Sequence, residues 1–265
     1  MQRARYRHAM AFDSAALLDW YARVRRPLPW RATRDPYALL VSEVMLQQTQ
    51  AARVVPYYEA FLARFPDPAG LAAAAPRDVL AAWSGLGYNR RALALHAAAR
   101  HVAERGWPDD LTDLPGVGPY TAAAVASFAW DRQVAAIDTN VRRVLERFDG
   151  VQRRPRALAE RTRELVPPGE AAAFNQAMME LGATVCRPRA PRCPACPVRH
   201  GCAGGTVTHR RRGAERFEDS DRHARGRVVA ALVNGDRPPD VDDRILAGLE
   251  RDGLIVRDAH GPRLP

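Results

Sequence analysis

The residues whose types and spacing best suit chemistry lie between positions 114 and 140, which read LPGVGPYTAAAVASFAWDRQVAAIDTN. Gly116 and Gly118 flank Val117, and both glycines can take positive φ, which lets the backbone approach a partner closely. Because such a turn feeds the N-terminus of a helix, its N–H groups can bind an anion. In a basic protein we expect that anion to be a DNA phosphate, bound without regard to base sequence. Asp138 follows twenty residues after Gly118, with Asn140 beside it.

Each part of this stretch also has a structural interpretation. A Gly-Val-Gly turn alone is typical of an ordinary helical hairpin. An aspartate ahead of TNVRRV is typical of a helix N-cap. Neither feature alone therefore distinguishes a catalytic site from an ordinary pair of helices.

The four cysteines form a second candidate site. Cys186, Cys193, Cys196 and Cys202 are spaced C-x6-C-x2-C-x5-C, and no cysteine lies elsewhere in the chain. Four thiolates can hold a zinc ion, but structural zinc sites usually use two tight cysteine pairs, and only one is present. Four cysteines also ligate a [4Fe–4S] cluster. Disulfides are not expected in a cytoplasmic chain.

Composition limits the class of protein. The chain has 265 residues and is 47% hydrophobic, which is enough for a packed core, and its net charge of +10 suits a polyanionic partner. No apolar run is long enough for a transmembrane helix and no signal peptide is recognisable, so we expect a cytoplasmic protein without membrane contact. All 40 cationic residues are arginine. A lysine nucleophile for a Schiff base is therefore excluded.

Helical periodicity predicts the elements that must position these residues. The sequence shows it over 13–24, 36–48, 51–64 (with a possible division at Pro56), 66–79, 89–106, 139–148 and 170–186. No strand-like stretch of any length precedes residue 205. Residues 203–227 are rich in Gly, Arg and Asp and predict a linker. Residues 228–265 predict two helices and a short β-wing, a small winged-helix-like module.

The hairpin and Asp138 together resemble the signature of the helix-hairpin-helix/Gly-Pro-Asp superfamily of base-excision DNA glycosylases. This resemblance implies an all-α fold of two lobes. We expect a core over 1–202, with a six-helix lobe at about 32–138 and a second lobe of 1–31 plus 139–202, the latter carrying the cysteine loop 186–202. Superfamily members that also cut the strand have a lysine two residues after the second glycine. Tyr120 stands there, so we expect a monofunctional glycosylase without lyase activity.

Further motifs narrow the resemblance to the MutY family of adenine DNA glycosylases: LPWR (28–31), SEVMLQQTQ (42–50), GLGY (85–88) and FNQAMMELGA (174–183). The resemblance implies removal of adenine mispaired with 8-oxoguanine or guanine in double-stranded DNA. It implies that Glu43, in an apolar helix, is the general acid that protonates adenine, with a raised pKa. Asp138 would stabilise the positively charged sugar or bond to it transiently, supported by Tyr120 and Asn140.

The resemblance also implies the residues that bind DNA and the base. The DNA-binding set is the hairpin residues Gly116, Val117, Gly118 and Thr121, and Gln47, Gln48, Leu86 and Tyr88, of which Gln48 and Tyr88 would enter the base stack. The set for the adenine pocket is Trp30, Arg31, Leu46 and Gln176. The resemblance implies a [4Fe–4S] cluster rather than zinc at the four cysteines. We expect a monomer.

The match to MutY fails after the cysteines. Typical members carry a Nudix-like domain that helps to read 8-oxoguanine, and residues 203–265 are too few for one. Two other functions stay open at this point. One is a thymine or uracil mismatch glycosylase of the same superfamily, and the other is a non-catalytic iron–sulfur DNA-binding module.

Overall fold

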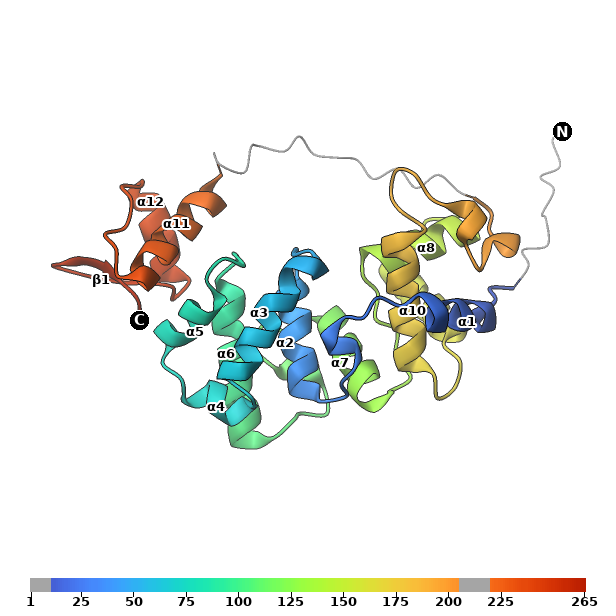
Figure 1. Cartoon of the computed structure of the whole chain (residues 1–265), viewed down its shortest axis with the longest axis horizontal. Coiled ribbons are helices and arrows are strands. Elements are labelled where there is room, and N and C mark those ends of the chain that lie inside the picture. The colour runs from blue at the N-terminus through green and yellow to red at the C-terminus, as the bar shows by residue number, and fades with distance from the viewer. Residues whose placement is uncertain (1–10, 205–219) are drawn as a thin grey trace. The chain divides into compact units, whose positions relative to one another are not determined.

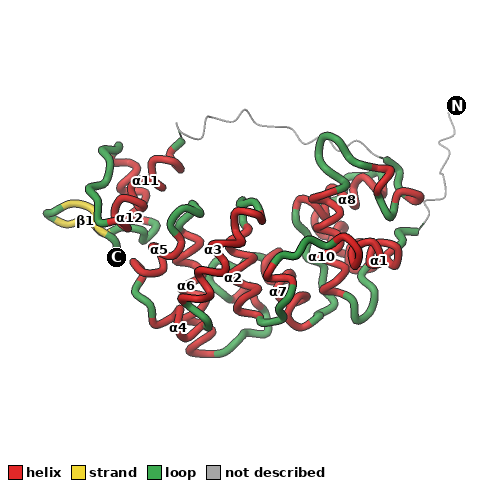
Figure 2. The backbone as a smooth tube through the Cα atoms, in the orientation of Figure 1, coloured by secondary structure: helices red, strands yellow, loops and turns green. Residues whose placement is uncertain are grey.

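The structure is a computed structural model that describes residues 11–204 and 220–265, and helices make up most of it (Figures 1 and 2). The chain divides into two compact units, residues 1–27 with 119–210 and residues 28–118 with 211–265. The mainly helical fold with a helix-hairpin-helix core confirms the fold class expected from the sequence. In the parts of the chain that the structure describes, no helix is long and apolar enough to cross a bilayer.

The unit of residues 28–118 and 211–265 is built around a buried helix. Its first part contains η1 (Pro29–Arg31), α2 (Pro36–Leu46), α3 (Ala51–Arg64), α4 (Pro68–Ala73), α5 (Pro76–Trp83), α6 (Arg90–Arg105) and η2 (Leu111–Asp113). Helix α2 starts on the Asp35 cap with Pro36 in its first turn, and nine of its eleven residues are buried. It packs on α3 and α6, so its apolar sequence is explained by contact on several sides.

The C-terminal module belongs to the same unit. It consists of α11 (Asp221–Asn234), α12 (Asp243–Arg251) and an antiparallel pair, β1 (Val256–Asp258) and β2 (Gly261–Arg263), with Val256 opposite Arg263. Val228, Val229, Ile245 and Leu249 form its small buried face. The two helices and the β-wing confirm the predicted winged-helix-like arrangement. Helix α11 also packs on α5.

The other unit carries the second core. Its elements are α1 (Ser14–Val24), α7 (Pro119–Trp130), α8 (Thr139–Asp149), α9 (Pro155–Leu165), α10 (Ala171–Thr184), η3 (Cys193–Ala195) and η4 (Arg199–Gly201). Helix α10 packs against α1, α7 and α8, as Figure 1 shows for α1 and α8. Phe12 lies edge-on to Phe148 and Phe174 in this core, with ring centroids 4.8 and 6.3 Å apart.

The structure differs from the predicted elements at several places. Helix α3 continues through Pro56 without a division. Helix α9 was not predicted, although Pro155 at its first position and an apolar face at Leu158 and Thr162 explain it. Helix α11 begins at Asp221, so the last part of the predicted linker 203–227 is helical, and most of the rest lies outside the described residues. The predicted lobe limit near 138 stays a prediction; the compact units divide after Gly118, and α7 packs on α10.

Candidate active site and DNA interface

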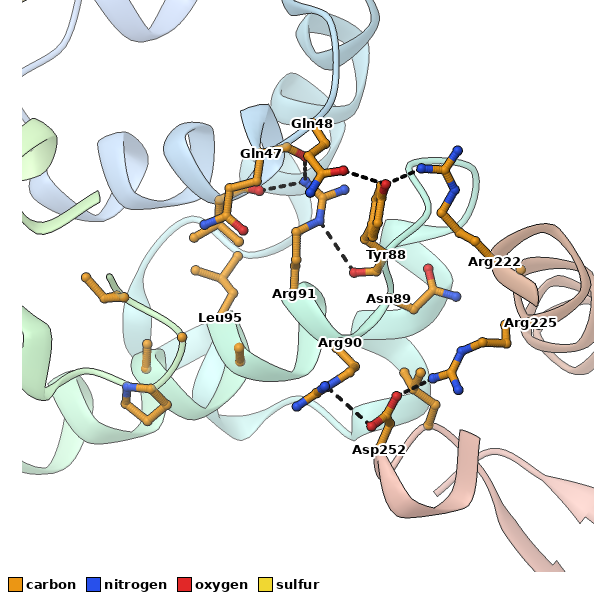
Figure 3. Close-up of a pocket in the computed structure, with 18 of the residues that line it drawn as sticks. Gln47, Gln48, Tyr88, Asn89, Arg90, Arg91, Leu95, Arg222, Arg225 and Asp252 are labelled. Carbon is orange, nitrogen blue, oxygen red and sulfur yellow. Dashed lines mark hydrogen bonds and ion pairs between the residues drawn. The ribbon is translucent and has the colours of Figure 1, made fainter. Parts of the chain in front are cut away.

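Arg91 holds the C-terminal end of α2, the helix that carries Glu43. Its Nη1 donates to the carbonyl oxygens of Val44, Met45 and Gln47 at 2.8, 3.0 and 2.6 Å. Its Nη2 donates to the carbonyl oxygen of Gly87 at 3.0 Å, and Figure 3 shows the bond of Arg91 to Gln47. These acceptors include carbonyls that the end of a helix leaves without an intrahelical donor. Burial lowers the pKa of Arg91 to about 10, so the guanidinium stays charged at neutral pH.

The bonds of Arg91 join two turns, residues 47–50 and residues 84–89, which we call the twin turns. Gln48 and Tyr88 have φ of 57° and 49°, in the left-handed region that side chains rarely adopt. The Arg91 guanidinium lies 5.3 Å from the Trp83 ring and 5.4 Å from the Tyr88 ring. The hydroxyl of Tyr88 donates to Oε1 of Gln48 at 2.5 Å. The two residues expected to enter the base stack therefore touch each other and share one support.

The Gly-Val-Gly turn packs against α6. Gly116 has φ of 75°, and a Cβ atom there would lie 2.5 Å from the Cβ of Ala94, so only glycine fits. Gly118 differs from the expectation, because its φ is outside the left-handed region. A Cβ at Gly118 would meet nothing within 4 Å, so the turn is open on this side. Val117 is buried, and its amide donates to the carbonyl of Leu114 at 3.1 Å.

Glu43 and most of its expected pocket neighbours lie in one unit. Glu43 is 4% exposed on α2, between the buried residues Ser42 and Val44. Trp30 is buried and lies edge-on to Tyr58, with ring centroids 5.4 Å apart. Arg31 ends η1 next to it, and Leu46 ends α2. Glu43 is therefore a carboxyl group buried in the core of this unit.

Asp138 is the N-cap of α8. Its Oδ1 accepts from the amides of Asn140 and Val141 at 2.8 and 2.7 Å, and its Oδ2 accepts from Nδ2 of Asn140 at 2.6 Å. An N-cap and a catalytic carboxylate are therefore compatible roles for Asp138, because the cap fixes the carboxylate at one position. Three N–H donors are thus directed at the two carboxylate oxygens of Asp138.

Arg143 connects this aspartate to the cysteine loop. It is 4% exposed, and its Nη2 donates to Oδ1 of Asn140 at 2.8 Å and to the carbonyl of Gly182 at 2.7 Å. Its Nε donates to the carbonyl of Cys186 at 2.8 Å. Desolvation lowers the pKa of Arg143. Arg147, one helical turn later, donates to the carbonyls of Arg187 and Pro188 at 2.6 and 2.7 Å.

The four cysteines are neighbours in space. Burial raises the pKa of the Cys196 thiol to about 11, and the charges of the three other cysteines add to the rise. N–H groups approach two of the sulfurs: Nη1 of Arg147 lies 3.4 Å from Sγ of Cys186, and the Gly204 amide 3.4 Å from Sγ of Cys202. Within residues 11–204 and 220–265, no three His, Cys, Asp or Glu side chains lie close enough to hold a single metal ion.

The other expected site residues occupy both units. Tyr120 lies near the start of α7, and its hydroxyl is 3.7 Å from Sδ of Met179. Gln176 on α10 accepts from the hydroxyl of Tyr21 at 2.6 Å. Thr121 and Leu86 are buried, with 3% and 6% exposure, so their side chains serve packing in this structure. Their roles in DNA binding stay predictions.

Sequence reasoning missed the arginines that support the site. Arg91, Arg143 and Arg147 were not singled out, although Arg143 and Arg147 stand four residues apart in TNVRRVLERF and thus share a helix face. That shared face was the sequence signal by which Arg143 and Arg147 could have been found. No local signal marked Arg91, because three of its acceptors, at the C-terminal end of α2, lie more than forty positions away.

Comparisons with known proteins agree with this geometry. Residues 41–168 match the HhH-GPD superfamily of base excision DNA repair proteins. The chain is 40% identical to an adenine DNA glycosylase of Mycolicibacterium smegmatis, with 95% of both chains covered. It is 42% identical to one of Mycobacterium tuberculosis, with 92% of this chain and 90% of the other covered. A human adenine DNA glycosylase is 41% identical over 71% of this chain and 38% of its own.

Solved structures share the fold. A thermostable thymine-DNA glycosylase superposes with a TM-score of 0.67 at 32% identity, over 72% of this chain and 93% of the other. A complex of endonuclease III with DNA superposes with a TM-score of 0.63 at 23% identity, over 72% and 92% of the two chains, and supports the fold alone. From the two mycobacterial relatives and the motifs at Glu43, Gln48, Tyr88 and Asp138, we conclude that the chain belongs to the adenine DNA glycosylase family of the HhH-GPD superfamily.

Proposed function

We propose that this protein is a monofunctional glycosylase that hydrolyses the N-glycosyl bond of adenine mispaired with 8-oxoguanine or guanine, in base excision repair. The observation that carries the proposal is the pair of carboxylates in opposite environments. Glu43 is enclosed in the apolar helix α2, whereas Asp138 accepts three hydrogen bonds from N–H donors. Enzymes that cleave glycosidic bonds usually use two carboxyl groups, one as a general acid and one as an anion.

In the proposed reaction, the Glu43 carboxyl group donates its proton to N7 of adenine. The bond between N9 and C1′ then breaks, and its electron pair leaves with the base. Asp138 stabilises the positive charge on the sugar, or bonds to C1′ transiently, while Asn140 and Arg143 hold it in place. Water adds to C1′, and its proton returns to Glu43, which restores the starting state.

Strand cleavage through a Schiff base is not part of the proposal. The chain has no lysine, and Tyr120 stands at the position after the hairpin where lyases place theirs. The abasic site would therefore remain as product. Breakage of the strand would require alkali or another enzyme.

For DNA binding we propose the hairpin and the twin turns. The backbone of residues 116–118 would bind a phosphate through its open side at Gly118. Gln48 and Tyr88 would enter the stack where adenine is extruded, and their left-handed turns already direct both side chains to one place. Gln47 would accompany them, and Trp30, Arg31, Leu46 and Gln176 would line the base pocket.

We further propose that Cys186, Cys193, Cys196 and Cys202 hold a [4Fe–4S] cluster. A bound cluster would supply a covalent closure for a loop with few apolar side chains. The N–H groups near Cys186 and Cys202 would stabilise the sulfur ligands, and Arg143 and Arg147 would attach the loop to α8. The proposed enzyme acts as a monomer in the cytoplasm.

The function can be tested by single-turnover base release from four labelled duplexes, containing A opposite 8-oxoguanine, A opposite G, T opposite G and A opposite T. We expect adenine release from the first two only, with strand breaks appearing only after alkali. Absence of adenine release from both of the first two duplexes would contradict the proposal. Breaks without alkali would contradict the monofunctional assignment.

A thymine mismatch glycosylase is the second candidate, since a solved thymine-DNA glycosylase shares 32% identity and the fold with this chain. Release of thymine from the T:G duplex, with no release of adenine, would favour it. The SEVMLQQTQ motif and the names of the mycobacterial relatives favour adenine.

A further inference from the structure

A basic groove lies between α11 of the C-terminal module and the twin turns. Its volume is about 590 Å³, and it is lined by residues 48–50, 84–89 and the first turns of α11. The basic side chains on its lining are Arg53, Arg222, His223 and Arg227, and none of the described lining residues is Asp or Glu. A concave surface with arginines and no carboxylate concentrates positive potential.

Four carboxylates of the module form ion pairs with arginines that do not line the groove. Asp221 pairs with Arg244 at 2.9 Å, and Asp252 pairs with Arg225 and, at 3.5 Å, with Arg90. Asp243 and Glu250 both pair with Arg257. Arg227 is exposed and forms no ion pair with the described residues. The positive charge of Arg227 is therefore not offset by a carboxylate of the described residues.

Arg222 ties the groove to the residues proposed to enter DNA. Its guanidinium carbon lies 4.8 Å from the centre of the Tyr88 ring, and its Nη1 donates to the Tyr88 hydroxyl, which itself bonds to Gln48 (Figure 3). Arg53 donates to the carbonyl of Gly85 on the opposite wall. A duplex that receives Tyr88 in its stack must bring its backbone within reach of Arg222.

Helix α11 adds its N-terminus to this surface. Arg222 and His223 lie in its first turn, and Ser220 caps it by accepting from the His223 amide at 3.3 Å. The positive end of a fourteen-residue helix favours an anion at the same place as the arginines.

We propose that α11 forms a second phosphate-binding wall, so that the groove between it and the twin turns binds the phosphodiester backbone of DNA without reading its sequence. Arg222 and Arg227 contribute from α11, and Arg53 from α3. The inference rests on the proposed function, since it assumes that Gln48 and Tyr88 meet a duplex. It gives the C-terminal module a direct part in holding DNA beside the lesion.

The test compares two pairs of substitutions in the full-length protein with its cofactor bound. Arg222→Ala/Arg227→Ala removes two charges from the groove, and Arg237→Ala/Arg251→Ala removes two exposed charges from the same module outside it. The dissociation constant for an undamaged 25-base-pair duplex is measured at several salt concentrations. Removal of two arginine–phosphate pairs should weaken binding about 60-fold at 0.1 M salt and lower the salt slope by about 1.8.

We expect the groove pair to show this weaker binding and smaller slope, and the control pair to resemble the wild type. Arg222→Lys/Arg227→Lys should restore most of the slope, which separates removal of charge from misfolding. Equal salt slopes for the groove pair and the control pair would overturn the inference about the groove. If the wild type still releases adenine in that case, the proposed function is not affected. Tighter binding by the groove pair would overturn it too, and would mean that α11 covers the twin turns. Absence of both duplex binding and base release in the wild type would overturn the function as well.

Discussion

Replacement of Arg91 should separate the role of the twin turns from that of the general acid. Arg91 has two hydrogens on Nη1 for three carbonyl acceptors and one on Nη2 for Gly87, so about three hydrogen bonds are made at once. At about 1 kcal/mol each for a half-buried group, their loss in Arg91→Met predicts destabilisation by about 3 kcal/mol. Arg91→Lys should retain one of the bonds and lose about 2 kcal/mol.

The functional loss should follow from the same hydrogen bonds. Without the guanidinium, Gln48 and Tyr88 can leave their left-handed conformations, each of which costs on the order of 1 kcal/mol. Placing them again when DNA binds would then cost about 2 kcal/mol, or about 30-fold in the single-turnover rate of adenine release. The rate should fall at saturating enzyme, because the fault lies in extrusion and positioning.

The assay combines urea unfolding with single-turnover adenine release at increasing enzyme concentration. Arg100→Met is the matched control, because Arg100 is an exposed arginine on the same helix. It should change stability by less than about 0.5 kcal/mol and leave the rate unchanged. If Arg91→Met unfolds and reacts like Arg100→Met, Arg91 does not hold the twin turns and the reasoning is refuted.

Three further predictions concern separate parts of the molecule. Gly116→Ala should destabilise by more than about 1 kcal/mol, because of its φ of 75° and the Ala94 contact, whereas Gly118→Ala should cost little stability; thermal unfolding compares them. Cys196→Ser should abolish iron binding and visible absorption, whereas serine at a position that binds no iron would leave the spectrum intact. Desolvation lowers the pKa of His96 below 6.5, so the unfolded chain binds the proton first as pH falls. The free energy of unfolding should therefore decrease as the pH falls below 6.5, and His96→Asn should remove this decrease. Identical urea unfolding curves at pH 7.5 and 5.5 would contradict the prediction.

Most of the fold could be predicted from short-range sequence patterns. The Asp138 cap, the apolar run of α2 and the glycine turn before α7 are short-range signals, and each of them lies at its predicted place. Helix α9 was not predicted, because its polar residues outnumber its apolar ones and only Leu158 and Thr162 are buried. The start of α11 was not predicted, because its first turn is as polar in sequence as the segment before it.

The supporting hydrogen bonds of the site could not be predicted, since they depend on residues far apart in the chain. Arg91 finds its acceptors on α2, and Arg143 finds Gly182 and Cys186 near the end of α10 and just after it. Arg222 lies 134 positions from Tyr88. An arginine on a helix is usually a solvated residue, so its sequence position alone does not reveal a buried partner.

The central claim is that Glu43 and Asp138 carry out hydrolysis, and the most direct measurement is single-turnover adenine release by Glu43→Gln and Asp138→Asn at saturating enzyme. Both variants keep the shape of the side chain, so duplex affinity measured alongside should stay near that of the wild type. Loss of a general acid predicts a rate lower by about 10²- to 10⁴-fold for Glu43→Gln, and we expect a loss of comparable size for Asp138→Asn. Base release by either variant at the wild-type rate would contradict the account.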